Sequence, residues 1–173
     1  MKIIALKGKN GSGKSTVAKF LSQKLEEKGI SNKVLAFAEP LKKIVNYIYD
    51  DVIEFENRKE KENNRNLLET TADAIKSSFS FNPFVYQVCR QLDYCYSYDI
   101  EVCIISDLRF ESEYDGLYNY VEADEQLIVV EIKNKLTDNN PPEYDELLIK
   151  ADKILVFNSK VEEQIDALIT ELL

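Results

Sequence analysis

The chain has 173 residues, with 22 Lys and Arg against 31 Asp and Glu and a formal net charge of −9. Because a chain of this length with 45% apolar residues can bury a core by itself, disorder and collagen-like repeats are excluded, and we expect one domain over residues 1–173. The sequence contains no histidine, which excludes Ser-His-Asp and Cys-His nucleophile pairs and every histidine-ligated metal site.

The first half of the chain opens with strand and helix patterns in alternation. Residues 2–6 predict a short buried strand, and residues 14–28 predict a helix that ends at Gly29. Residues 34–38 predict a second strand, and Pro40 begins a helix whose apolar residues recur at helical spacing up to Ile48. Residues 50–65 are mostly charged or amide-bearing, so we expect a solvated loop or insertion there.

The second half continues the alternation. Residues 67–79 and 83–98 predict two helices, the second capped by Asn82, and we expect them to pack together. Residues 100–105, 126–132 and 153–157 predict three strands, and Ser159 with Glu162 predicts a capping box for the last helix.

The longest aliphatic runs have about four residues, whereas a membrane span needs ~18, so we expect no membrane-spanning segment. The three cysteines have no CxxC spacing, which favours buried thiols in a reducing cytoplasm.

The strongest motif is Gly-Lys-Asn-Gly-Ser-Gly-Lys-Ser at residues 8–15, which matches the phosphate-binding loop G-x-x-x-x-G-K-[ST] between a predicted strand and a predicted helix. Glycines allow backbone N–H groups to surround a polyphosphate, the lysine reaches the β- and γ-phosphates, and the serine ligates Mg²⁺. We therefore expect an α/β fold of the P-loop NTPase type, a doubly wound five-stranded parallel sheet with helices on both faces. The expected ATP-binding residues are Lys9, Asn10, Gly11, Ser12, Gly13, Lys14, Ser15 and Thr16.

Asp107 follows the predicted strand 100–105, and Arg109 comes two residues later. An aspartate at a strand end beside the loop can bind Mg²⁺ directly or through the water ligands of the ion. An arginine there stabilises the negative charge that develops in phosphoryl transfer. A capping aspartate with a surface arginine is the structural alternative. We expect Lys14, Asp107 and Arg109 to be catalytic and Ser15 with Asp107 to hold Mg²⁺, partly through water. Glu111, Glu113 and Asp115 are expected on a solvated helix face.

Charge is unevenly distributed along the chain. Residues 1–43 carry a net charge of +7 and residues 44–173 carry −16. A long nucleic acid is bound through many phosphate contacts, and the negative charge of residues 44–173 would repel it. The charge distribution therefore favours small phosphorylated ligands over long nucleic acids. The four arginines all lie at or before position 109, and Arg65, Arg90 and Lys76 are candidates for binding the phosphate of an acceptor.

Several stretches resemble the P-loop deoxynucleoside monophosphate kinases of tailed phages. Besides residues 8–15, the likeness rests on Phe-Ala-Glu-Pro-Leu-Lys at 37–42, residues 65–73, Asn-Pro-Phe at 82–84, and Ser-Asp-Leu-Arg-Phe-Glu-Ser-Glu at 106–113. The resemblance implies phosphorylation of a deoxynucleoside monophosphate by ATP with Mg²⁺, commonly in a homodimer, in the cytoplasm of the host if the chain is phage-encoded. It also implies a helical acceptor-binding region at about 39–99 and, as residues lining the acceptor, Phe37, Lys42, Arg65 and Arg90.

The chain departs from that family at its expected lid. Residues 133–144 contain two lysines and no arginine or histidine, which predicts a reduced lid over about 133–150. Three alternatives stay open: a P-loop kinase for another small phosphorylated or base-modified acceptor, a noncatalytic ATP-binding module, and, least favoured because of the negative charge of residues 44–173, a kinase acting on bases within DNA.

Overall fold

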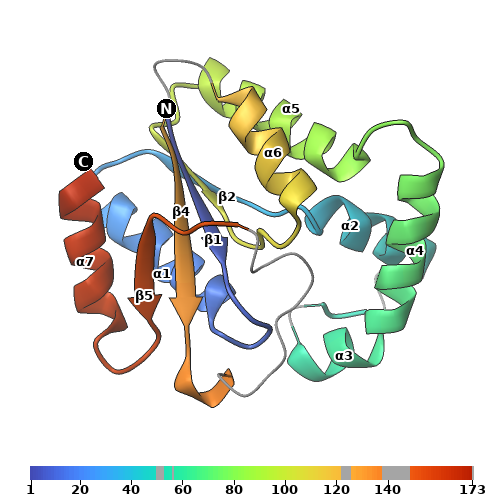
Figure 1. Ribbon diagram of the computed structural model, residues 1–173, viewed down its shortest axis with the longest axis horizontal. Coiled ribbons are helices and arrows are strands. Elements are labelled where there is room, and N and C mark those ends of the chain that lie inside the picture. The colour runs from blue at the N-terminus through green and yellow to red at the C-terminus, as the bar shows by residue number, and fades with distance from the viewer. Residues whose placement is uncertain (50–52, 56, 122–125, 138–148, 173) are drawn as a thin grey trace.

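The computed structural model describes residues 1–49, 53–55, 57–121, 126–137 and 149–172 (Figure 1). Strands alternate with helices along most of the chain, as the sequence predicts, and the middle of the chain is helical. The elements are β1 (Lys2–Lys7), α1 (Lys14–Glu27), β2 (Asn32–Leu35), α2 (Glu39–Ile48), α3 (Arg58–Asn63), α4 (Arg65–Ser77), α5 (Pro83–Ser97), β3 (Val102–Ile105), α6 (Glu111–Tyr120), β4 (Gln126–Lys133), the 3-10 helix η1 (Lys135–Thr137), β5 (Lys153–Val156) and α7 (Val161–Leu172).

The sheet has five strands in the order β2-β3-β1-β4-β5, and every paired neighbour is parallel. Strand β1 lies in the middle, between β3 and β4. The expected fold class, a P-loop NTPase-type parallel sheet, is therefore confirmed. The carboxyl ends of all the strands meet at one edge of such a sheet, and the residues that follow β1 and β3 come together there.

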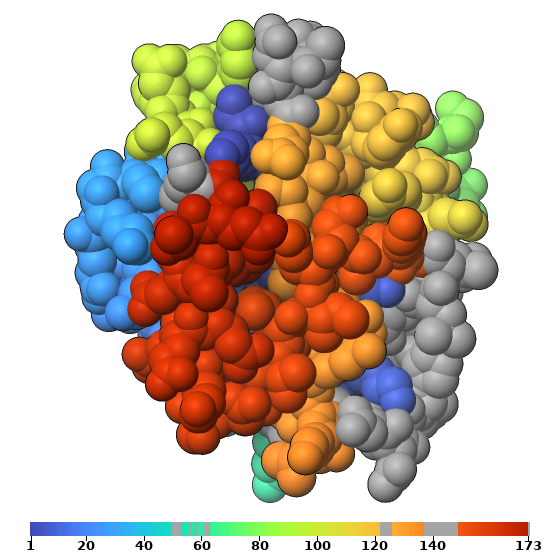
Figure 2. Space-filling model, turned by 60° about the vertical axis from the view of Figure 1, so that its left-hand side comes forward, coloured from blue at the N-terminus to red at the C-terminus, as the bar shows by residue number. Residues whose placement is uncertain are grey.

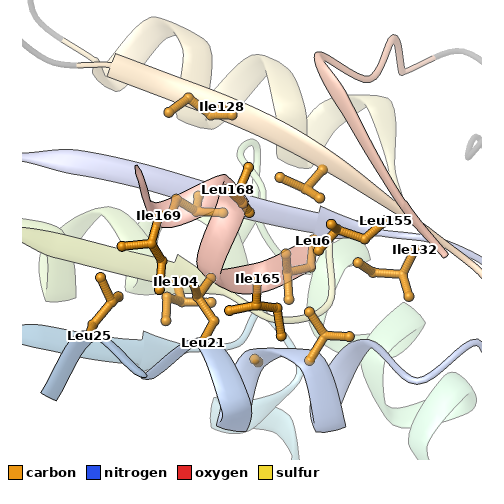
Figure 3. Packing of buried hydrophobic residues seen from close by; sticks show 14 of the residues in the cluster. Leu6, Leu21, Leu25, Ile104, Ile128, Ile132, Leu155, Ile165, Leu168 and Ile169 are labelled. Atoms are coloured by element: carbon orange, nitrogen blue, oxygen red, sulfur yellow. The ribbon is translucent and has the colours of Figure 1, made fainter. Parts of the chain in front are cut away.

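Helices cover both faces of the sheet because alternate strand residues point to opposite sides. On one face, Ile4 and Leu6 of β1 pack with Leu21 of α1 and with Ile165 and Leu168 of α7, the cluster drawn in Figure 3. On the other face, Ile3 and Ala5 of β1 pack with residues of α5 and α6, among them Val88, Leu92 and Leu117. Figure 1 shows the same layers, with α1 and α7 on one side of the strands and α5 and α6 on the other.

A third, smaller cluster lies outside the sheet. Leu41 and Val45 of α2 pack with Phe84 of α5, and apolar residues of α4 lie against them. The helices expected at 67–79 and 83–98 come together in this cluster, where α4 residues lie against Phe84 of α5 and Lys76 Nζ of α4 lies 5.9 Å from the centroid of the Phe84 ring, and α2 contacts both helices. Ile53 and Phe55 are also buried in this cluster, so the solvated loop expected over 50–65 is wrong for these residues and for α3.

Two other boundaries differ from the sequence predictions. Strand β2 ends at Leu35 instead of residue 38, because the backbone N–H groups of Phe37 and Ala38 donate to the Asp107 carboxylate rather than to a neighbouring strand. Helix α7 begins at Val161, and Asn158 binds the turn before it, where its Oδ1 accepts from the N–H of Lys160. This asparagine replaces the expected capping box of Ser159 and Glu162.

Gly116 gives a test of the contact between α5 and α6. A Cβ added to Gly116 would lie 2.2 Å from Cγ1 of Val85. We expect Gly116→Ala to lower the free energy of unfolding by about 1–3 kcal/mol, because overpacking outweighs the higher helix propensity of alanine. In a Val85→Ala background the same substitution should be neutral or stabilising. Urea unfolding of the wild type, the two single variants and the double variant measures these free energies. An equal loss of stability from Gly116→Ala in the wild-type and Val85→Ala backgrounds would contradict the contact.

Candidate functional site

Residues 8–13 form a tight loop between β1 and α1. Gly8, Gly11 and Gly13 have φ angles of 142°, 76° and 100°, which side chains rarely allow. Space is also limited, because a Cβ on Gly8 would lie 2.5 Å from the carbonyl oxygen of Ile132 and one on Gly13 would lie 2.7 Å from the ring of Phe157. The glycines that the motif requires are therefore required here by both backbone conformation and packing.

Lys14 is the first residue of α1 and is only 7% exposed. Its ammonium group turns back into the loop, where Nζ donates to the carbonyl of Gly8 and, at 3.0 Å, to that of Lys9. A cation is thus held inside the loop, beside the N-terminus of α1 and its partial positive charge. This arrangement attracts the phosphate groups of a nucleotide.

The other motif residues surround this lysine. Lys9 and Asn10 are half-buried in the loop, while Ser15 and Thr16 are exposed on the first turn of α1, where their hydroxyls can reach a ligand. Ser12 is 1% exposed, and its Oγ has no hydrogen-bond partner among the described residues. An unpaired buried hydroxyl is costly, so this atom is poised to accept or donate when a polar ligand enters the loop.

A second polar segment, residues 106–110, lies directly beside the loop. The N–H of Leu108 donates to the carbonyl oxygen of Leu6 at 3.1 Å, two residues before the loop begins. The N–H of Ser106 donates to the carbonyl of Leu35 at 2.9 Å, which fixes the segment to β2 on its other side. The geometry thus brings Asp107 and Arg109 to the same edge of the sheet as Lys14.

Asp107 connects the end of β3 to the turn before α2. Its Oδ1 accepts from the N–H of Phe37 at 2.8 Å, and its Oδ2 accepts from the N–H of Ala38 at 3.0 Å. An ionised carboxylate has about four acceptor positions, so each oxygen keeps capacity for water or a cation. The donor set of Asp107 and the Ser15 hydroxyl suits Mg²⁺, which prefers oxygen ligands and retains several waters.

Glu113 corrects the sequence interpretation of helix α6. We expected Glu111, Glu113 and Asp115 on a solvated face, but Glu113 is only 5% exposed. Its Oε2 accepts from the backbone N–H groups of Arg109 at 2.9 Å and of Phe110 at 3.1 Å. A glutamate at the third position of a helix often binds the residue preceding the helix, and this spacing was the available sequence signal.

Burial dominates the electrostatics of Glu113. Desolvation, together with the negative charge of Asp107, raises the pKa of Glu113 to about 7, against the opposing effect of the two backbone N–H groups and of Lys76. Lys76 comes from α4, and its Nζ lies 4.3 Å from the centroid of the Phe110 ring. The end of α4 thus contributes a cation to the cluster of Asp107, Arg109 and Glu113.

The four residues expected to line the acceptor are spread over several elements. Phe37 is buried in the core under α5, while Lys42 is half-buried on α2. Arg65 begins α4 and forms an ion pair with Glu69 at 3.8 Å. Arg90 is exposed on α5. Their roles stay predictions.

A pocket of about 410 Å³ opens where the ends of β4 and β5 meet, lined by residues 134–136 and 156–158. Figure 2 shows these surfaces side by side, the end of β4 with η1 in orange and the β5–α7 segment in red. Phe157 belongs both to this pocket and to the contact with Gly13, so the pocket adjoins the loop. Much of the lid expected over 133–150 lies outside the described residues, namely 138–148.

Among the described residues, no group of three or more Cys, Asp or Glu side chains is arranged to hold a metal ion. None of the described helices is long and apolar enough to cross a membrane.

A family model described as "ABC transporter" matches residues 1–140, which is most of the chain. The chain therefore belongs to this family, whose domain is a P-loop NTPase. No curated protein matches the sequence.

Solved structures with a similar fold include two kinases. A cysteine-to-alanine mutant of the APS kinase CysC from Mycobacterium tuberculosis has a TM-score of 0.56 and 17% identity, covering 99% of this chain and 96% of that one. The same enzyme in complex with AMPPNP and APS gives a TM-score of 0.51, also at 17% identity and with the same coverage. A sugar kinase from Janibacter sp. HTCC2649 gives 0.50 at 12% identity, covering 99% of this chain and 93% of that one. The chain thus shares the fold of these proteins.

The raised pKa of Glu113 predicts a pH-dependent stability. Because its pKa in the folded protein, about 7, exceeds the ordinary value of 4.5, the folded state binds this proton more tightly than the unfolded state. The free energy of unfolding should therefore fall as pH rises from about 5 to about 7. Glu113→Gln removes this titration, so relative to wild type it should gain roughly 3 kcal/mol between pH 5 and pH 8. Urea unfolding at both pH values measures this gain.

The exposed Asp115 on the same helix provides the control. Asp115→Asn should shift the stability equally at both pH values. A stability difference between wild type and Glu113→Gln that stays constant from pH 5 to pH 8 would show that Glu113 does not titrate in this range.

Proposed function

We propose that the chain is an ATP-dependent phosphotransferase that converts a deoxynucleoside monophosphate to its diphosphate. The observation that carries the proposal is the hydrogen bond from Leu108 N–H to the carbonyl oxygen of Leu6, at 3.1 Å, which joins the segment bearing Asp107 and Arg109 to the strand that ends in the phosphate-binding loop. A loop alone is enough to bind a nucleotide. A fixed arginine beside the loop is what a transferring phosphoryl group needs.

The donor end of the site is supported by the loop and the adjoining pocket. In the proposal, Lys9 to Thr16 bind the phosphates of ATP, and Lys14 neutralises the β- and γ-phosphates. The pocket lined by residues 134–136 and 156–158 takes the base, since Phe157 provides an aromatic face and Asn134 and Asn158 provide amide groups. The crystallised neighbour that carries AMPPNP supports an ATP-type donor.

Ser15 and Asp107 are the proposed ligands for Mg²⁺, with Asp107 acting partly through water. Bound there, the ion would offset the negative charge of the β- and γ-phosphates. Asp107 also keeps the turn before α2 in place through Phe37 and Ala38, so its side chain serves the acceptor side as well.

In the proposed reaction, an oxygen of the acceptor phosphate forms a bond to the γ-phosphorus of ATP while the bond from that phosphorus to the β,γ-bridging oxygen breaks, and ADP leaves. Arg109 stabilises the negative charge that spreads over the transferring group. Phe37, Lys42, Arg65 and Arg90 are the proposed acceptor contacts within residues 39–99 and the preceding turn. One domain over 1–173, a reduced lid at 133–150, a homodimer and a cytoplasmic location complete the proposal.

One alternative keeps the chemistry and changes the acceptor. The similar folds belong to an APS kinase and a sugar kinase, so another small acceptor, including APS, fits the same loop and arginine. A noncatalytic ATP-binding module is the other alternative, and it would bind ATP without releasing ADP.

The test is ADP release from Mg·ATP with each common deoxy- and ribonucleoside monophosphate and with APS. We expect turnover with at least one deoxynucleotide, and a loss of roughly 100-fold or more in kcat/KM for Lys14→Ala, Asp107→Ala and Arg109→Ala, because each removes charge stabilisation from the transferring group. Lys19→Ala, an exposed lysine on the same helix, is the matched control and should keep wild-type turnover.

The outcomes separate the alternatives. Turnover only with APS would replace the proposed acceptor and keep the phosphotransferase. If no acceptor gives turnover while saturating ATP still stabilises the protein, by about 2.7 kcal/mol at 100 times its Kd, the nucleoside monophosphate kinase proposal is wrong and leaves an unusual acceptor or a noncatalytic binding module.

A further inference from the structure

Glu113 is a buried carboxylate that the proposed reaction does not use directly. It lies on the first turn of α6, away from the phosphate-binding loop in sequence, and its Oε2 accepts from the backbone N–H groups of Arg109 and Phe110. Burying a carboxylate costs free energy, and the neighbouring charge of Asp107 adds to this cost. Glu111, in the same first turn of the helix, is exposed.

The segment that Glu113 binds is anchored residue by residue. Ser106 and Leu108 donate to the carbonyl oxygens of Leu35 and Leu6, so these anchors fix the start of the segment to the sheet. Asp107 accepts from the turn before α2. Beyond Leu108 the backbone leaves the sheet, and Glu113 supplies the acceptor for the next two N–H groups.

We infer that Glu113 is a positioning residue for the proposed phosphoryl transfer: by accepting hydrogen bonds from the N–H groups of Arg109 and Phe110, it fixes the backbone that carries the Arg109 side chain, in the segment that adjoins the strand before the phosphate-binding loop. This inference rests on the proposed function, because it requires that Arg109 acts on the transferring phosphate. In this proposal Glu113 itself contacts neither the γ-phosphate of ATP nor the acceptor phosphate.

The ring of Phe110 gives a second, independent constraint on the same backbone. Lys76 of α4 lies over this ring at 4.3 Å, and its charge also faces the Glu113 carboxylate. The charged groups around Glu113 are thus Asp107 from the end of β3 and Lys76 from α4. Phe110 is therefore held at two points, its N–H by Glu113 and its ring by Lys76. Both contacts restrict the backbone next to Arg109.

The test is a double-mutant cycle between Glu113 and Arg109, with kcat and KM measured for ATP and for the acceptor identified above. We expect Glu113→Ala to lower kcat by roughly 10- to 100-fold with KM for ATP changed less than about twofold, because a misplaced catalytic group affects the transition state more than ground-state binding. Glu113→Gln keeps a carbonyl oxygen that can accept the same N–H groups, so its loss should be smaller. In an Arg109→Ala background, neither substitution should lower kcat further by more than about twofold.

A second readout does not depend on turnover. Hydrogen exchange of the Arg109 and Phe110 amides should become at least about 10-fold faster in Glu113→Ala, because the acceptor of both amides is lost. Asp115→Asn on the same helix should change neither these exchange rates nor kcat.

Each result has one meaning. Turnover with equal Glu113 effects in the wild-type and Arg109→Ala backgrounds, or exchange rates unchanged by Glu113→Ala, would overturn this inference and leave the proposed function intact. Absence of wild-type turnover with every acceptor would overturn the proposed function and the role of Glu113 in it, whatever the exchange rates show.

Discussion

The hydrogen bonds between the Asp107 carboxylate and the N–H groups of Phe37 and Ala38 are the constraint on which the site depends. Strand β2 ends at Leu35, and these bonds hold the two residues that follow Ala36 in the turn that leads into α2. A carboxylate that accepts backbone N–H groups in a partly buried place is among the stronger hydrogen-bonding groups in proteins. This one joins the strand that carries the proposed catalytic residues to the helices that carry the proposed acceptor contacts.

The rest of the site follows from the order of the strands. Because β1 lies between β3 and β4, the phosphate-binding loop has the Asp107 segment on one side and the end of β4 on the other. On the Asp107 side, the N–H of Leu108 donates to the carbonyl oxygen of Leu6. On the β4 side, Gly8 closely approaches the carbonyl oxygen of Ile132. The order of the strands therefore brings Leu6 and Leu108 together, although they lie far apart in the chain.

The sequence predicted the features that depend on local chemistry. The phosphate-binding loop was recognisable because its glycines and lysine are required by the conformation of a single turn, and the five strands were recognisable because buried parallel strands are nearly continuous apolar runs. Boundaries were less accurate where a tertiary hydrogen bond decides them. Residues 36–38 look like strand residues, and only the Asp107 side chain, far along the chain, removes them from β2.

Glu113, Ile53 and Phe55 show what local patterns miss. Each stands among charged residues, so composition predicts exposure, but packing against distant elements buries all of them. For Glu113 the signal was its position in the first turn of α6, which charge alone did not reveal. The proposed acceptor contacts are the least determined by sequence, because Phe37, Lys42, Arg65 and Arg90 are spread over several segments.

The central claim is that the γ-phosphate of ATP goes to a phosphate acceptor and not to water, and ³¹P NMR of Mg·ATP with a mixture of the common deoxynucleoside monophosphates tests it most directly. The account predicts that the α- and β-phosphate resonances of a deoxynucleoside diphosphate appear as the monophosphate signal falls, in a one-to-one ratio with ADP. Inorganic phosphate as the only new product beside ADP, with every monophosphate unchanged, would identify an ATPase and contradict the account.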